Sequence, residues 1–306
     1  MELDFLPALI GDALGSSHQL EAYEPVVERN DYLVLVVTLG PAQTKVVVKL
    51  SGPAAPQWAQ AATFERAPVL SRLIRRQGVE VPEVLAVDTS RDRWPHSYLI
   101  TTFIEGTTLA VAAKRLAASD RAQLFTELGN AVARLHGLTF SAFGELMPSG
   151  EVQARSPYPE ALMKRAAERV SNGTHLDLFR ELVEAHRGEL GEVRRAALTH
   201  EDLNPYNLLV AWRGETAHLA AVLDLSSAWA GNPESDLARL ELWRGMMHPA
   251  FWAAYQPEPQ IASGYARRRA VLQFLWCLEY ASPNRQHHAV TAAVCASLGI
   301  PAVRFD

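Results

Sequence analysis

The sequence has few of the features that mark secreted, membrane-spanning or nucleic-acid-binding proteins. It contains only two cysteines, Cys277 and Cys295, too few for a disulfide framework and without the spacing of a metal site. It has no run of 18 or more apolar residues, so no membrane-spanning helix is predicted. The formal net charge is -5, which argues against non-specific binding to nucleic acid or to a membrane surface.

The N-terminal stretch, residues 1–15, is apolar but acidic. It has neither a basic leader nor a small-residue cleavage site, so we expect no secretion signal and a cytoplasmic protein. The hydrophobic content of 48% and the charged content of 21% are ordinary for a globular chain. A length of 306 residues is enough for two lobes with separate cores.

Residues 197–228 carry the pattern with the clearest chemical meaning. His200, Asp202 and Asn207 fit H-x-D-x-x-x-x-N, and Asp224 follows at the end of the next apolar run. In catalytic loops that transfer phosphoryl groups, an Asp at this place accepts the proton of the substrate hydroxyl. The Asn and a second Asp hold magnesium. Each residue alone is an ordinary turn residue, so the prediction depends on the whole set.

The same stretch predicts a β-hairpin, because two apolar runs, residues 208–212 and 218–223, flank a polar turn that contains glycine. Antiparallel pairing about that turn would place Asn207 opposite Asp224 at the open end of the hairpin. Two oxygen ligands for a hard cation would then converge. Asp202 would lie within reach of a hydroxyl beside that metal ion.

The segments LTHEDLNPYNLLV and AAVLDLSSAWAGNPESDLARL resemble the aminoglycoside phosphotransferase and choline kinase family, relatives of the protein kinases that act on small molecules. The resemblance implies an α+β, two-lobed protein-kinase-like fold. Residues 1–105 would form a small antiparallel-sheet lobe that binds nucleotide, and residues 106–306 a larger, mainly helical lobe for catalysis and acceptor binding. The implied reaction is ATP- and Mg-dependent phosphoryl transfer to a hydroxyl of an aminoglycoside-, choline- or sugar-like molecule.

Within this resemblance, Lys49 would position the nucleotide phosphates. It lies in the last of three β-rich runs that predict an antiparallel meander, residues 20–27, 32–39 and 45–50. The loop between the first two runs, residues 28–31, has no glycine, whereas kinases usually have a glycine-rich flap there so that backbone N–H groups can approach phosphate. A nucleotide or phosphate donor other than ATP is therefore an open alternative.

Glu65 is the implied ion-pair partner of Lys49, with Glu80 and Glu83 as alternatives. It lies in a helical pattern over residues 58–77. Pro68 follows three residues later and cannot donate a helical hydrogen bond, so we expect the helix to kink or to begin near it.

A strand predicted over residues 98–104 leads to Gly106, where we expect the boundary between the lobes. The resemblance implies a hinge that binds the adenine edge, formed by Thr102, Phe103 and Ile104. It further implies that His200 anchors the catalytic loop and that Asp236, in the first turn of a helix running to about residue 247, braces it.

The second half of the chain is predicted to be mostly helical. Ser119 is the expected N-cap of a helix ending at Gly137, with an apolar stripe of Leu124, Leu128, Val132 and Leu135. His136 is expected to be structural, and residues 151–195 to form two helices near the acceptor. Both cysteines are expected to be buried. Helix-spaced aromatics are usually core, but a cage for a cationic group is an alternative for Trp243, Trp252, Trp276 and Tyr280.

Three other functions remain open. Asp224 is followed by Leu225 and Ser226, so the DFG-to-APE stretch of a kinase that acts on proteins is missing, but protein phosphorylation is still an alternative. The glycine-free loop is compatible with a nucleotide-binding pseudokinase. The third alternative is a structural or interaction protein that binds no nucleotide.

Overall fold

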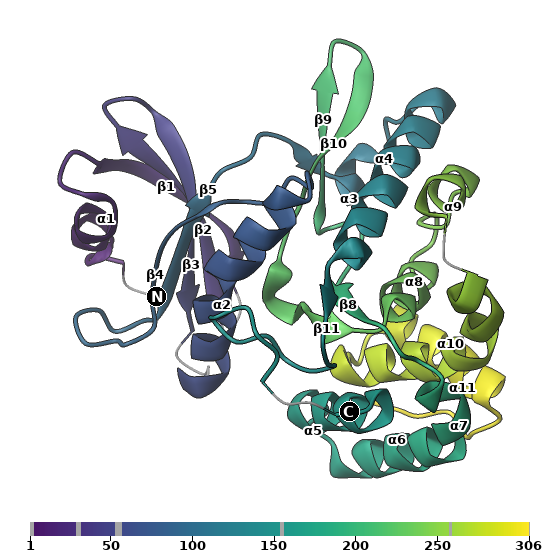
Figure 1. Cartoon of the computed structure of the whole chain (residues 1–306). Helices are drawn as coiled ribbons and strands as arrows, with labels where there is room; N and C mark the ends of the chain where they lie inside the picture. Colours follow the sequence, from purple (N-terminus) through teal and green to yellow (C-terminus); the bar gives the residue numbers. More distant parts are fainter. Residues whose placement is uncertain (1–2, 29–31, 53–56, 154–155, 257–258, 306) are drawn as a thin grey trace. The chain divides into compact units, whose positions relative to one another are not determined.

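The computed structural model describes residues 3–28, 32–52, 57–153, 156–256 and 259–305 (Figure 1). The chain separates into two compact units. The first comprises Met1–Gly106, Met147–Gly150 and Ala220–Ser226. The second comprises Thr107–Leu146, Glu151–Leu219 and Ser227–Asp306. The segment that contains Asp224 therefore packs within the first unit, although it follows the catalytic-loop motif in the sequence.

The first unit contains a five-stranded sheet in the order β1-β2-β3-β5-β4, and each neighbouring pair is antiparallel. Its strands are β1 (Gln19–Glu28), β2 (Tyr32–Gly40), β3 (Thr44–Ser51), β4 (Val84–Asp88) and β5 (Tyr98–Thr102). The predicted meander is confirmed. The strand predicted over residues 98–104 ends at Thr102. β4 was not predicted, because it is a short edge strand of mostly half-exposed residues and lacks a clear alternation.

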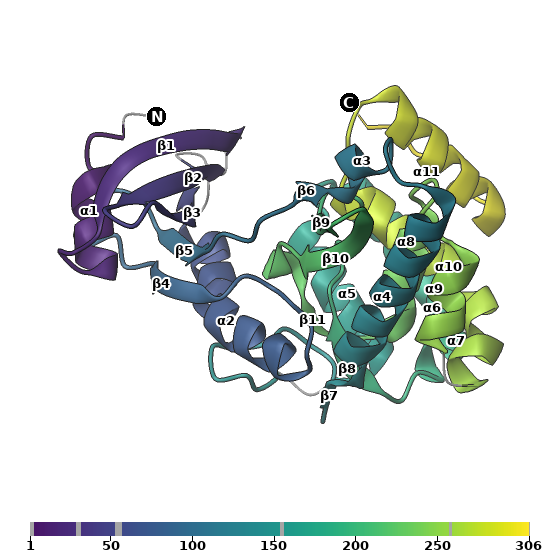
Figure 2. The ribbon, with the colours of Figure 1, turned by 90° about the horizontal axis from the view of Figure 1, so that it is seen from above.

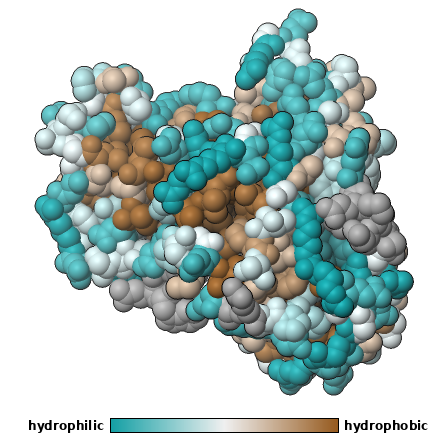
Figure 3. All heavy atoms as spheres, viewed as in Figure 1, coloured by the Kyte–Doolittle hydropathy of each residue, from teal (hydrophilic) through white to brown (hydrophobic). Residues whose placement is uncertain are grey.

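Alternate residues of β2 and β3 point into one core, as the two-residue period of a strand requires. Helix α1 (Leu6–Leu14) covers this face with Leu6, Leu9 and Ile10, all fully buried. Helix α2 (Gln57–Arg76) lies on the other side of the sheet from α1, as both ribbon views show (Figures 1 and 2). On the face shown in Figure 3, hydrophobic residues (brown) gather over the strands of this unit.

Helix α2 confirms the helical pattern over residues 58–77 and excludes one of the two expectations for Pro68, that the helix begins near it. The helix begins at Gln57, so Pro68 lies inside it and does not mark its start. Proline removes one backbone hydrogen bond. Apolar side chains on both sides of it, including Phe64, Leu70 and Ile74, are buried and stabilise the continuous helix through packing.

The second unit is mainly helical and contains two small sheets, in the orders β10-β9-β6 and β11-β8-β7. The strands are β6 (Thr107–Thr108), β7 (Thr139–Phe140), β8 (Ala196–Thr199), β9 (Leu208–Arg213), β10 (Thr216–Val222) and β11 (Trp229–Gly231). The helices are α3 (Leu109–Ala112), α4 (Ala118–Gly137), α5 (Tyr158–Arg169), α6 (Gly173–Ala185), α7 (Arg187–Gly191), α8 (Pro233–Glu241), α9 (Pro249–Tyr255), α10 (Pro259–Glu279) and α11 (Arg285–Leu298). Helix α4 packs along α9, and α10 packs against α8 and α11.

The predicted hairpin is confirmed, because β9 and β10 are neighbours in one sheet. The apolar stripe of α4 is buried as predicted, but Ser119 is not its N-cap: the cap is Ala117, without a side-chain hydrogen bond. Residues 151–195 form three helices where two were predicted. Helix α8 ends at Glu241, earlier than predicted.

Both cysteines are buried, Cys277 in α10 and Cys295 in α11, as expected. Among the described residues, no helix has the length and apolar character needed to cross a membrane.

Candidate active site

The catalytic-loop motif lies between two strands of the second unit, β8 and the buried first half of β9. β8 is the middle strand of its sheet and is buried along its whole length. The chain leaves β8 after Thr199, forms the loop of residues 200–207, and enters β9 at Leu208. A loop that emerges from the centre of a packed sheet has both ends held, so its side chains can be positioned accurately.

Asp202 and Asn207 come together in this loop, as the motif predicts. Asn207 Nδ2 donates to Asp202 Oδ2 at 2.8 Å and to the Asp202 carbonyl at 2.9 Å. Asn204 Nδ2 donates to the other carboxylate oxygen, Oδ1, at 2.9 Å. Two side-chain amides therefore orient the carboxylate of Asp202, which is only partly buried. Because the Nδ2 group of Asn207 binds Asp202, its Oδ1 is the atom of that side chain that could ligate a cation.

Asp236 and His136 are buried and form a hydrogen-bonded chain that ends on the loop backbone. Asp236 is fully buried, and its carboxylate accepts the backbone N–H of His200 at 2.8 Å and that of Glu201 at 2.7 Å. His136 Nε2 lies 3.0 Å from the same carboxylate, and its Nδ1 lies 2.8 Å from the Tyr255 hydroxyl. The supporting role implied for Asp236 stays a prediction, and His136 is buried, as expected. His200 is also buried, and its Nδ1 accepts the Asp202 N–H at 3.2 Å.

Glu201 and Asn204 were missed by the sequence analysis. Asn204 could have been predicted as a turn residue, because an Asn side chain often accepts the backbone N–H two residues further on, as Asn204 Oδ1 does from Tyr206 at 2.9 Å. Glu201 could not have been found, because its side chain is buried and ion-paired with Arg239 of α8 at 2.8 Å. Nothing in the sequence near Glu201 indicates this partner, 38 residues away.

Two buried carboxylates of this unit, those of Asp236 and Glu201, have a pKa lowered by their surroundings. Burial alone would raise the pKa of Asp236, but hydrogen bonding and charge from His136, together with His200, outweigh it and lower the pKa. The pKa of Glu201 is lowered in the same way, because Arg239 and Arg165 outweigh its burial. Burial and the charge of Asp202 together raise the pKa of the Tyr280 hydroxyl.

In the first unit, Lys49 lies on β3, the central strand of the sheet. Its Nζ lies 3.8 Å from Asp224 Oδ1 and 4.5 Å from the centre of the Tyr32 ring. Asp224 adopts φ 56°, and its Oδ1 accepts the Ser226 N–H at 3.2 Å. The structure therefore pairs two of the predicted site residues, Lys49 and Asp224, in one unit.

Glu65 is exposed, and its carboxylate accepts the Thr89 hydroxyl at 2.6 Å. The two alternatives, Glu80 and Glu83, both pair with Arg75, at 3.0 Å and 3.8 Å. These contacts give no support to an ion pair between Lys49 and Glu65, which stays a prediction.

The predicted hinge begins at the end of β5. Thr102 exchanges two hydrogen bonds with Glu83: its N–H donates to the Glu83 carbonyl, and its hydroxyl accepts the Glu83 N–H, both at 2.9 Å. The ring of Phe103 lies 5.3 Å from Lys45 Nζ. Contacts of Thr102, Phe103 and Ile104 with an adenine ring remain a prediction.

The described residues contain no group of three or more His, Cys, Asp or Glu side chains that could hold a metal ion. Magnesium does not need such a group, because it usually binds one or two protein oxygens together with substrate phosphates and water. Magnesium binding by Asn207 and by Asp224 stays a prediction.

Aromatic residues lie beside the catalytic loop but do not form the four-membered cage. The contacts run from Tyr206 to Trp243, from Trp243 to Trp276, and from Trp276 to Tyr280, with ring centres 5.7–6.0 Å apart. Trp252 instead contacts Phe251 and Tyr255 of its own helix.

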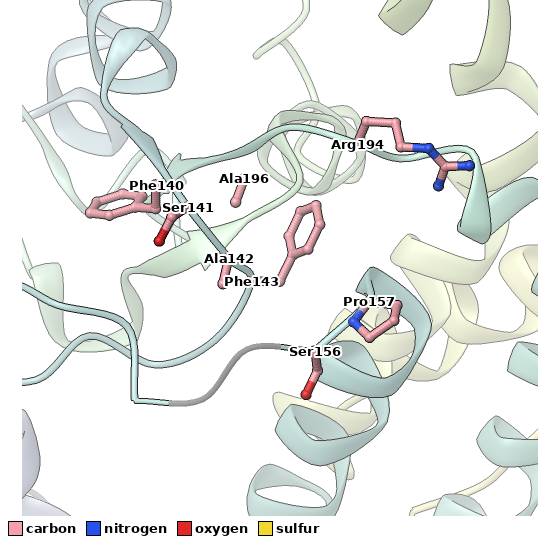
Figure 4. Close-up of a pocket in the computed structure, with 8 residues that line it drawn as sticks. All are labelled: Phe140, Ser141, Ala142, Phe143, Ser156, Pro157, Arg194 and Ala196. Atoms are coloured by element: carbon pink, nitrogen blue, oxygen red, sulfur yellow. The ribbon is translucent and has the colours of Figure 1, made fainter.

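A cavity of ≈ 300 Å³ in the second unit contains none of the predicted site residues (Figure 4). It is lined by Phe140, Ser141, Ala142, Phe143, Ser156, Pro157, Arg194 and Ala196. Its lining is about equally polar and apolar, and the two serines are its only residues with a nucleophilic or acid–base side chain. We therefore place the candidate active site at the catalytic loop.

An antiparallel sheet with a central lysine and a helical unit with a braced Asp–Asn loop define a protein-kinase-like phosphotransferase. The chain belongs to the phosphotransferase enzyme family, because the sequence model of that family (APH) matches residues 27–271. It thus falls in the class of small-molecule kinases, as the resemblance implied. A search of curated proteins found no match.

Solved structures share the fold at low sequence identity. Aminoglycoside phosphotransferase APH(4)-Ia, in a ternary complex with AMP-PNP and hygromycin B, is 16% identical over 96% of this chain and 97% of that chain, with a TM-score of 0.64. A fructosamine-3-kinase from Haemophilus somnus is 13% identical over 96% of each chain, with a TM-score of 0.63. An APH(2″) enzyme in complex with GDP and kanamycin is 14% identical over 91% of each chain, with a TM-score of 0.62. These likenesses confirm the α+β, protein-kinase-like fold.

Proposed function

We propose that the protein transfers the terminal phosphoryl group of ATP, with magnesium, to a hydroxyl group of a small molecule. The observation that carries this proposal is the carboxylate of Asp202, held by Asn204 and Asn207 at 2.9 Å and 2.8 Å in a partly exposed position. A carboxylate with this geometry can orient a hydroxyl and accept its proton. The buried Asp236, which binds two backbone N–H groups of the loop, keeps the loop in position.

In the reaction, the acceptor oxygen forms a bond to the terminal phosphorus while the bond from that phosphorus to the bridging oxygen breaks. The hydroxyl proton passes to Asp202, and the nucleoside diphosphate leaves. Lys49 would position the phosphates from the first unit. Asn207 and Asp224 would hold magnesium, which when bound neutralises charge on the phosphates. Catalysis of this kind is mostly positioning and electrostatic stabilisation.

We propose that residues 1–105 form the nucleotide-binding lobe and that residues 106–306 provide catalysis and acceptor binding. The relatives were solved with the aminoglycosides hygromycin B and kanamycin, and one is a fructosamine kinase. Aminoglycosides, amino alcohols such as choline, and sugars are therefore the acceptors to test first.

The donor could be ATP or GTP, because relatives were solved with AMP-PNP and with GDP. The loop of residues 28–31, which motivated the donor alternative, lies outside the described residues apart from Glu28. The choice of donor is thus a matter for experiment.

The chain between Asp224 and α8 argues against a protein substrate. A 3₁₀ helix (Leu225–Ser227) follows Asp224 directly, β11 follows at Trp229, and α8 begins at Pro233. This connection leaves no room for a long activation segment of the kind that protein kinases use.

A screen for nucleoside diphosphate release tests the proposal. The purified protein is incubated with ATP or GTP, with magnesium or EDTA, and with panels of aminoglycosides, amino alcohols, sugars and nucleosides. We expect turnover with at least one hydroxyl acceptor, and Asp202→Asn should lower kcat by about 10²- to 10⁴-fold while nucleotide affinity stays near that of the wild type.

Full activity in Asp202→Asn would contradict the assignment of the base. Nucleotide binding without turnover on any panel would favour a pseudokinase. A protein that gains no thermal stability from ATP, GTP or magnesium would not be a nucleotide-binding protein at all.

A further inference from the structure

Glu201, the residue immediately before the proposed base, has an unusual backbone conformation. Its φ is 65°, in the left-handed region that residues with a side chain rarely adopt. Such a conformation persists only when the surrounding structure holds it, and it is found preferentially at functional sites. Glu201 must therefore be held by contacts with the residues around it.

The side chain of Glu201 is held by four donors from three different elements. One carboxylate oxygen, Oε1, accepts the Thr199 hydroxyl at 2.6 Å and the Trp229 indole N–H at 2.8 Å. The other, Oε2, accepts the Ser235 hydroxyl at 2.7 Å and pairs with Arg239 Nη2 at 2.8 Å. β8, β11 and α8 supply these donors, and the two side chains of the ion pair are each only 1% exposed.

The backbone of Glu201 is held as firmly as its side chain. Its N–H donates to Asp236 at 2.7 Å, and its carbonyl accepts Arg239 Nη1 at 2.7 Å and the Tyr280 hydroxyl at 3.5 Å. Arg239 thus binds both the carbonyl and the carboxylate of a single residue, with two nitrogens of one planar guanidinium group. Such a two-point contact fixes the orientation of Glu201 relative to the guanidinium group as well as the distance between them.

Two of the donors to the Glu201 carboxylate are closely packed against strand β11. Gly231 of β11 lies beside the two donors to Oε1, and a Cβ added there would overlap the Trp229 indole nitrogen and lie 2.6 Å from Thr199 Oγ1. A side chain at position 231 would therefore displace the donors.

We infer that Glu201 and Arg239 are a positioning pair for the proposed base. The carbonyl of Glu201 and the N–H of Asp202 belong to the same rigid peptide plane. The N–H, the carbonyl and the carboxylate of Glu201 are all held by other residues. The orientation of the peptide that leads into Asp202 is therefore fixed as well. We assign neither residue a contact with the substrate; both act through the 201–202 peptide. The inference rests on the proposed role of Asp202.

The test compares steady-state kinetics of variants with the best acceptor found for the wild type. Glu201→Gln keeps the size of the side chain but removes the charge and places hydrogens where two of the donors point. We expect kcat to fall by about 10- to 100-fold, since misplacement of a reacting group by ~1 Å can cost about 100-fold. The KM for the nucleotide should stay close to that of the wild type. Arg239→Lys, which keeps the charge but not the two-point contact, should lose less activity.

The matched control is Glu234→Gln. Glu234 lies in the same helix as Arg239 and forms an ion pair with Arg268, at 2.5 Å, in which both side chains are also buried. This variant should lose stability, as Glu201→Gln does, but keep its kcat. If Glu201→Gln does not fold, Ser235→Ala replaces it, because it removes one donor from the same carboxylate.

The outcomes separate the inference from the proposed function. A folded Glu201→Gln or Ser235→Ala variant with wild-type kcat would overturn the positioning role while leaving phosphoryl transfer in place. Equal losses of kcat in the Glu201 and Glu234 variants would show a general effect of stability and would also overturn it. A wild-type protein without turnover on any acceptor would overturn the proposed function, and the inference with it.

Discussion

Asp236 gives the sharpest test of how the catalytic loop is held. Its buried carboxylate accepts three hydrogen bonds, from the backbone N–H groups of His200 and Glu201 and from His136 Nε2. In Asp236→Asn one oxygen remains, and an NH₂ group replaces the other. If the oxygen takes the Oδ2 position it keeps the bonds from His200 and His136, and the NH₂ group then faces the Glu201 N–H, so at least one buried hydrogen bond is lost.

The expected loss follows from these contacts. Leaving one buried donor without an acceptor costs roughly 1–3 kcal/mol, and the two remaining bonds become weaker because they no longer end on a charged group. Together these effects predict a fall of about 3 kcal/mol in the free energy of unfolding. For a unit of this size, that corresponds to a fall of roughly 6–12 °C in Tm. Urea denaturation and calorimetry on the wild type and Asp236→Asn measure both quantities.

The pH dependence provides a second readout of the same contact. Because the pKa of Asp236 is lowered in the fold, its contribution to stability is complete above the ordinary aspartate value of about 3.9. The contribution is lost as the pH falls through the lower, folded-state pKa. The stability difference between wild type and Asp236→Asn should therefore be constant from about pH 5 to 8 and shrink in more acidic solution.

Asp177→Asn is the matched control, because Asp177 is exposed and pairs only with the exposed Arg180 among its described ionic contacts. It should change the free energy of unfolding by no more than about 0.5 kcal/mol. A loss of less than about 0.5 kcal/mol in Asp236→Asn as well, or a difference that grows on acidification, would refute the bracing role of Asp236.

Two further predictions concern packing. Gly231→Ala should destabilise the protein by about 1–3 kcal/mol, because the added Cβ overlaps buried hydrogen-bond donors. Gly188→Ala is the control: an added Cβ there meets nothing within 4 Å, so this variant should be neutral or slightly stabilised. Similar Tm values for the two variants would contradict the expected overlap at position 231. Cys277 should resist thiol reagents at pH 8 until the protein is denatured, because the side chain is buried and burial raises the pKa of its thiol to about 11. Rapid labelling of the native protein, detected by mass spectrometry, would contradict this and would show that α10 opens.

The sequence predicted local elements well where a periodic pattern was long or a turn was clear. The meander of β1 to β3, the helix α4 and the β9–β10 hairpin all follow from strand or helix periodicity. The errors occurred where tertiary packing decides. Pro68 stays inside α2 because buried side chains flank it, and α4 begins without the cap that Ser119 would have provided.

The candidate site divides in the same way. The sequence by itself determined that Asp202 and Asn207 share a loop between two strands, because their spacing and the flanking apolar runs are local properties. Only the tertiary structure decided what holds that loop: Asp236 and Arg239 reach it from α8, and Glu201 is buried by β8, β11 and α8 together. A carboxylate can stay ionised in the interior only if partners compensate its lost hydration, and those partners are distant in the chain. For the same reason, the ion pair of Lys49 with Asp224 is a property of the fold and not of either motif.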